Sequence, residues 1–126
     1  MITTLVIGAG GALGAMLRHG VNLAALAVFP TSFPLGILLI NIAGSFVMGV
    51  LTGVFAHLWE PSQTVKLFLT VGVLGGFTTF SAFSLDAVLL WQRGEVAQAS
   101  LYVLSSVVFS IGALVLGLWI VRVLSL

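Results

Sequence analysis

The chain of 126 residues is 60% hydrophobic and only 6% charged, with a mean hydropathy of +1.30. A soluble domain carries about 25% charged residues, so the lipid bilayer must be the solvent for most of this surface. The net charge is only +1 and there are no basic runs, so we do not expect nucleic acid as a partner. The absence of cysteine excludes disulfides and cysteine-ligated metals.

Four apolar segments are each long enough to cross a bilayer, which takes about 20 mostly apolar residues as a helix. They run over about 2–29, 33–58, 64–91 and 96–121. No Lys or Arg precedes the first segment, which continues past signal-peptide length, so we expect it to stay in the mature protein. The sequence predicts an all-α membrane protein, residues 1–126 forming a single transmembrane domain, and the short connections predict that consecutive helices are antiparallel neighbours.

Arg18, His19 and Asn22 interrupt the first segment, and Asn41 lies within the second. Arg18 is the only fixed cation well inside an apolar stretch, and such a charge either serves a function or extends its head to the membrane surface. Asn41 lies inside the second segment, where its amide can join two helices or donate to an anion. The sequence leaves both alternatives open for each residue.

The third segment differs from the others because Gly75 and Gly76 precede Thr78 and Thr79 near its middle. Glycine weakens a helix by about 1 kcal/mol, and threonine hydroxyls compete for backbone carbonyls. The pattern predicts a local break, which a membrane tolerates only where the backbone is buried in protein or lines a cavity. Freed carbonyls and amides there are natural ion ligands. The alternative is a kink whose hydroxyls bond only to their own backbone.

Two phenylalanines follow this break on one helix face. Phe80 and Phe83 are three residues apart, with Ser81 and Ser84 as a neighbouring polar stripe. The edges of aromatic rings carry partial positive charge, so the two rings can face an anion that no fixed cation holds tightly. The alternative is that they are ordinary lipid-facing or packed side chains.

The fourth segment carries a line of hydroxyls, because Tyr102, Ser106 and Ser110 recur every four residues. These hydroxyls and the Asn41 amide are uncharged polar groups in mid-membrane. Such groups suit a permeant ion that must bind weakly enough to leave. A proton-coupled antiporter would need a carboxylate in mid-membrane, and the first segment has none. No nucleophile–base pair or metal cluster is present, and we expect no enzymatic activity.

Glycines and cations indicate how the segments assemble. Glycines recur four residues apart within three segments, a spacing that allows close helix packing in lipid; the pairs are Gly10 with Gly14, Gly49 with Gly53, and Gly72 with Gly76. Lys66 and Arg122 would lie on one side of the membrane, and Arg18 and Arg93 on the other. This balance gives no orientation signal. We therefore predict insertion in both orientations and an antiparallel homodimer, with any ion pathway at an interface between copies.

The string from Gly75 to Ser84 (Gly-Gly-Phe-Thr-Thr-Phe-Ser-Ala-Phe-Ser), with Asn41 and Arg18, resembles the Fluc (CrcB-type) fluoride channels. The resemblance covers essentially the whole chain. It implies a dual-topology antiparallel homodimer with two fluoride pathways. It also implies a location in the bacterial cytoplasmic (inner) membrane, from which fluoride leaves the cell passively.

The resemblance also implies residue roles. Phe80 and Phe83 would meet fluoride with their ring edges, Asn41 would donate its amide, and Arg18 would line a vestibule. The rest of the anion pathway would be Thr79, Ser81, Ser84, Tyr102, Ser106 and Ser110. A structural sodium ion on the dimer axis would be held by the backbone carbonyls of Gly75 and Thr78. The chain departs from the family pattern at Ile37 and Leu39, where threonine is common, and at Asp86, where glutamate is usual.

Two other functions share the size and topology of this chain. A small dual-topology multidrug exporter would carry a membrane-embedded glutamate in its first helix, which is absent. A membrane subunit that transports nothing would use its glycines only for assembly, and would tolerate apolar replacements at Asn41, Phe80 and Phe83.

Overall fold

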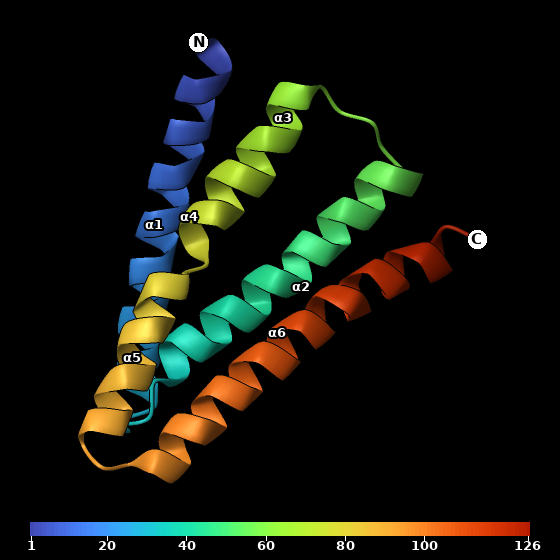
Figure 1. The fold of residues 1–126 in the computed structure, drawn as a ribbon. Helices are drawn as coiled ribbons and strands as arrows, with labels where there is room; N and C mark the ends of the chain where they lie inside the picture. The colour runs from blue at the N-terminus through green and yellow to red at the C-terminus, as the bar shows by residue number, and fades with distance from the viewer.

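The computed structural model describes residues 1–126, and its regular structure is entirely helical. Four stretches are long and apolar enough to cross a membrane, namely Ile2–Val28, Leu35–His57, Gln63–Gln92 and Val96–Leu124. Three of them are continuous helices, α1 (Ile2–Val28), α2 (Leu35–His57) and α6 (Val96–Leu124) (Figure 1). The predicted four-helix membrane fold with an interrupted third span is confirmed, and the chain is a multi-pass membrane protein.

The third span is built from four short pieces. It begins as α3 (Gln63–Leu67), widens into the π-helix η1 (Phe68–Leu74), tightens into α4 (Gly75–Phe77) and resumes as α5 (Phe80–Gln92). Between α4 and α5, Thr78 and Thr79 are extended, with ψ angles of 157° and 121°.

The two threonines, rather than the glycines before them, make the break. Gly75 is still helical, with φ −62° and ψ −37°. The Thr78 hydroxyl donates to the Leu74 carbonyl at 2.9 Å and closes the last turn of α4. The Thr79 hydroxyl accepts from the Ala82 amide at 3.1 Å and caps the first turn of α5. Each hydroxyl therefore satisfies a backbone group of the helix on one side of the break.

The spans pack in two parallel pairs rather than as a ring of consecutive neighbours. In Figure 1, α1 runs beside the third span and α2 runs beside α6, and these are also the pairs with the most extensive packing. Consecutive spans are antiparallel and contact each other, as predicted, but the most extensive packing is between alternate spans. The reason is that the glycine faces meet between alternate spans.

Glycines bring the backbones of these pairs into contact. A Cβ added at Gly10 of α1 would lie 2.8 Å from the Phe68 carbonyl oxygen in η1. A Cβ at Gly117 of α6 would lie 2.6 Å from the Phe46 carbonyl oxygen in α2. Real Cβ atoms do not approach carbonyl oxygens so closely, and the predicted packing role is confirmed for all three glycine pairs: Gly10 and Gly14, Gly49 and Gly53, Gly72 and Gly76.

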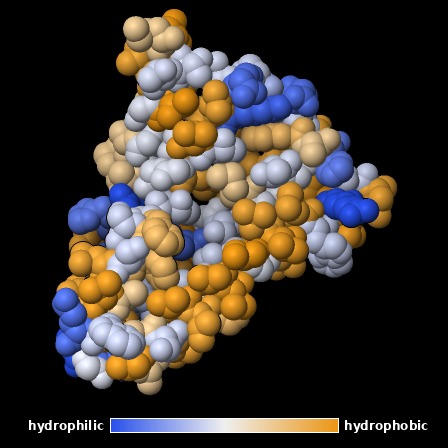
Figure 2. Space-filling model, in the orientation of Figure 1, coloured by the Kyte–Doolittle hydropathy of each residue, from blue (hydrophilic) through white to orange (hydrophobic).

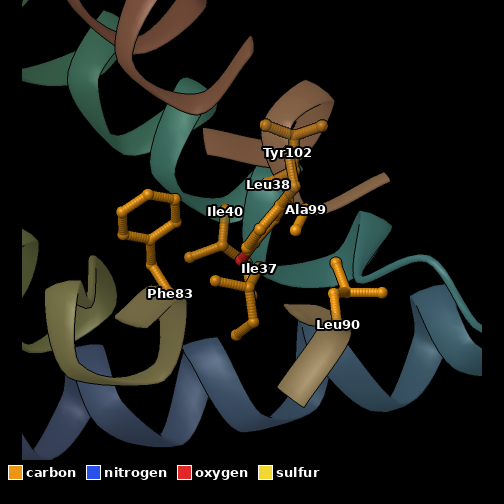
Figure 3. Close-up of a cluster of buried hydrophobic side chains, with 7 residues drawn as sticks. All are labelled: Ile37, Leu38, Ile40, Phe83, Leu90, Ala99 and Tyr102. Atoms are coloured by element: carbon orange, nitrogen blue, oxygen red, sulfur yellow. The ribbon is translucent and has the colours of Figure 1, made fainter. Parts of the chain in front are cut away.

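The buried core lies where α2, α5 and α6 meet. Figure 3 shows Phe83 from α5 beside Ile40 of α2, with Tyr102 of α6 and Leu90 in the same cluster. Only 20 of the 126 residues are buried, so most apolar side chains face outward. Figure 2 shows them spread over the visible face, with hydrophilic side chains gathered in a few places. Lipid or another protein surface must cover so large an apolar area.

A candidate ion pathway beside the helix break

An open cavity of about 430 Å³ lies beside the break, bordered by α2, the third span and α6. Half of its 14 lining residues are hydrophobic, and none carries a charge. The structure brings six of the residues predicted for the anion pathway to this cavity: Asn41, Thr79, Phe80, Phe83, Ser106 and Ser110.

Asn41 joins α2 to the break through both atoms of its side-chain amide. Its Nδ2 donates to the Thr79 carbonyl oxygen at 3.0 Å, and its Oδ1 accepts from the Thr79 amide at 2.8 Å. Of the two alternatives left open for Asn41, the link between helices is therefore observed. The second N–H of Nδ2 forms no bond within the chain, so the amide keeps one donor beside the cavity.

The two phenylalanine rings occupy different depths of the cavity. Their centroids are 5.5 Å apart with the planes tilted by 56°. Phe83 is only 8% exposed and packs against the Tyr102 ring at 5.1 Å, whereas Phe80 is 78% exposed. The cavity thus has a fixed ring in its wall and a second ring that nothing in the same chain covers.

Ser106 and Ser110 present buried hydroxyls that have no hydrogen-bond partner in the chain. They lie one turn apart on α6 and both line the cavity. A helical serine commonly bonds a carbonyl one turn earlier, as Ser105 does to Leu101 at 2.6 Å. Leaving a buried hydroxyl unpaired costs about 1–3 kcal/mol. The two serine hydroxyls would therefore be stabilised by a hydrogen-bond partner that enters the cavity.

Tyr102 continues the serine line but lies outside the cavity. It is fully buried, and its hydroxyl donates to the Asp86 Oδ2 at 3.3 Å. Asp86 in turn lines a second cavity of about 210 Å³ together with Asn22 of α1. Tyr102 therefore contacts Phe83 of the first cavity with its ring and Asp86 of the second cavity with its hydroxyl. The sequence showed the hydroxyl line but gave no sign that Asp86 is the partner of Tyr102.

Three further residues predicted for the pathway, in addition to Tyr102, lie away from the cavity. The Ser84 hydroxyl donates to the Phe80 carbonyl at 2.9 Å, and the Ser81 hydroxyl lies 3.3 Å from that of Thr79. Arg18 is half-buried on α1 and forms no ion pair. Gly44, which the sequence interpretation overlooked, does line the cavity. Its position one turn after Asn41 is the signal that would have found it.

The break also leaves backbone carbonyls without helical donors. The Thr79 amide bonds to Asn41 and is withdrawn from the Gly75 carbonyl, its partner in a continuous helix. The Ala82 amide bonds to the Thr79 hydroxyl and is withdrawn from the Thr78 carbonyl in the same way. Carbonyl oxygens are ligands for small hard cations, so Gly75 and Thr78 have the chemistry to contribute to such a site.

Comparison with known proteins gives a family match over residues 5–118, to the family described as "CrcB-like protein, Camphor Resistance (CrcB)". A protein of Methylobacterium nodulans named "Fluoride-specific ion channel FluC" is 55% identical over 122 residues, 97% of this chain and 98% of that protein. A protein of the same name from Rhodopseudomonas palustris is 49% identical over 124 residues, 98% of this chain and 100% of that protein. "Fluoride-specific ion channel FluC 1" of Nitrobacter hamburgensis is 49% identical over 120 residues, 95% of each chain.

Proposed function

Because the chain belongs to the CrcB family, we propose that it is a fluoride-selective channel, not an enzyme, through which cytoplasmic fluoride leaves the cell passively. The observation that carries the proposal is the uncharged cavity beside the break, which is lined by two unpartnered serine hydroxyls and two phenylalanine rings. Hydroxyl protons and ring edges both present partial positive charge to an anion.

The start of α5 adds to the attraction for an anion. Thr79 caps only the Ala82 amide, so the first amides of α5 keep their protons free. The aligned peptide dipoles give this end of a helix partial positive charge, which favours a nearby anion. No lysine or arginine lines the cavity, so the anion is attracted without being held by a full charge. Fluoride, a small and strong hydrogen-bond acceptor, suits such donors.

The working unit of the proposal is an antiparallel homodimer with two pathways. Phe80 lines the cavity but is 78% exposed, which supports a second copy of the chain covering this ring. The large exposed apolar surface supports the same assembly, with lipid around it. The even division of the four Lys and Arg residues between the two ends of the helices supports insertion in both orientations, in the bacterial cytoplasmic membrane.

A sodium ion at the dimer centre is the cofactor of the proposal. The carbonyls of Gly75 and Thr78, freed from helical bonding, are the residues of this chain that would hold it. When bound, the ion would supply positive charge that satisfies these two carbonyl oxygens. The same two carbonyls in the second copy would complete the ligand set.

Fluoride efflux from liposomes tests the proposed function. Vesicles that contain the protein and are loaded with fluoride are expected to release it when the membrane potential is clamped, as measured with a fluoride electrode. Vesicles loaded with chloride should retain it, and an imposed proton gradient should leave the fluoride rate unchanged. Absence of fluoride release, or equal release of chloride, would exclude a fluoride-selective channel.

Topology is tested with reporter fusions at the C-terminus. An enzyme active only in the cytoplasm and one active only outside it are each expected to show activity, because the chain inserts in both orientations. Adding two lysines after Leu126 should bias the population to one orientation. Exclusive activity of one reporter on the unmodified chain would contradict dual topology.

A further inference from the structure

We propose that Asn41 is a positioning residue that maintains the helix break at Thr79. By doing so it keeps the Gly75 carbonyl free of its helical donor and fixes the direction of the Phe80 ring. The inference deepens the proposed function and rests on it for its consequence in transport. Its structural content, that one side chain from α2 maintains the break, stands independently of what passes through the cavity.

Asn41 contacts both peptide groups of Thr79. The side-chain amide bonds the peptide N–H and the peptide C=O of the same residue, at 2.8 and 3.0 Å, as a neighbouring β-strand would. Neither group of Thr79 has a backbone partner. Thr79 is 7% exposed, so water does not replace these bonds. All backbone hydrogen bonding of the extended residue thus comes from one side chain 38 positions away.

Without the Asn41 side chain, both peptide groups of Thr79 would lack a partner. Two unpaired peptide groups at membrane depth are strongly unfavourable. The acceptor in the same chain that a continuous helix would offer the Thr79 amide is the Gly75 carbonyl, four residues earlier. Removing Asn41 therefore favours closure or loosening of the break. In both cases the geometry between α4 and α5 changes.

Both proposed ion sites depend on this geometry. The Gly75 carbonyl is free because its helical donor is taken by Asn41. Phe80 follows Thr79 directly, so the direction of its ring is set by the orientation of the fixed peptide. The remaining N–H of Asn41 is oriented by the same two bonds. Asn41 consequently couples the fluoride pathway to the sodium site through the backbone between them.

The experiment measures the distance across the break in the whole protein. The chain lacks cysteine, so cysteines introduced at the exposed Val65 and Val88 carry spin labels on either side of the break. In a straight helix, 23 residues of separation span about 35 Å, within the range of pulsed electron resonance. Labelled chains are diluted with unlabelled ones so that only distances within one copy are recorded.

Asn41→Leu, which keeps the size of the side chain and removes its hydrogen bonds, is expected to shift or broaden the distance distribution. The matched control is Ser110→Ala, which alters the same cavity but removes no bond in the chain and should superimpose on the parent. Asn41→Asp keeps the acceptor for the Thr79 amide, so its distance distribution is expected to lie between those of the parent and Asn41→Leu. This variant serves as the folded test case if Asn41→Leu does not assemble. An unchanged distribution in a folded Asn41 variant would overturn the inference.

A sodium titration of thermal unfolding separates this inference from the proposed function. The sodium concentration for half-maximal stabilisation is expected to rise about tenfold or more in Asn41→Asp, as when a group that orients a metal ligand is lost. It should not change in Ser110→Ala. A parent protein without any sodium dependence would remove the sodium site from the proposed function, while the distance measurement would still decide the role of Asn41. An equal midpoint in the parent and in Asn41→Asp would overturn the coupling.

Discussion

Replacing Phe80 with isoleucine is expected to lower the rate of fluoride efflux at least about tenfold, which corresponds to about 1.4 kcal/mol in the barrier. Isoleucine has no ring edge, so the anion loses a partially positive wall and gains an apolar one. Because Phe80 is 78% exposed within one chain, the substitution removes little packing inside the subunit. The loss should therefore appear in transport rather than in folding.

The measurement is fluoride release from liposomes that contain equal amounts of parent or variant protein. The matched control is Leu85→Ile, an equally conservative change at an exposed apolar residue of the same helix that does not line the cavity. The control should release fluoride at the parental rate. Parental efflux by Phe80→Ile would show that the ring does not meet the ion.

Replacing Gly14 with alanine is expected to prevent correct packing of α1 against the third span. The added Cβ would overlap the Val73 carbonyl oxygen and lie 2.7 Å from the Phe77 amide nitrogen. Both neighbours are backbone atoms, which cannot rotate away as a side chain can. Overpacking a well-packed site usually costs about 1–3 kcal/mol, and a clash between backbones belongs at the upper end.

Gly8→Ala is the matched control, because it lies on the same helix with no atom within 4 Å of an added Cβ. Alanine there should be neutral or stabilise the helix by up to about 1 kcal/mol. The two variants are compared by the yield of monodisperse protein in detergent and by its thermal unfolding midpoint. Equal yield and midpoint for Gly14→Ala and Gly8→Ala would contradict the packing of α1 on the third span.

Much of the fold can be predicted from the sequence because a bilayer permits few kinds of backbone structure. Apolar length alone gives the four spans, and the glycine pairs identify the faces that pack. The two threonines identify the interrupted span because their hydroxyls bond to nearby backbone groups within the same segment. These are local signals, and the structure contains them as expected.

The pairing of groups from different spans could not be predicted in this way. The sequence marks Asn41 and Thr79 as polar, but only the arrangement of α2 against the third span brings the amide to one peptide. The bond between Tyr102 and Asp86 is similar, since neither residue indicates its partner. The more extensive packing of alternate spans also depends on which glycine faces are complementary, and spacing within one helix does not reveal this.

The helix that carries Asn41 precedes the broken span in the chain. Synthesis proceeds from the N-terminus, so α2 and its asparagine leave the ribosome before the threonine that they bind. The extended peptide can therefore find its acceptor and donor as soon as the third span enters the bilayer. A permuted chain in which the third span preceded α2 would have to hold those peptide groups unpaired during insertion.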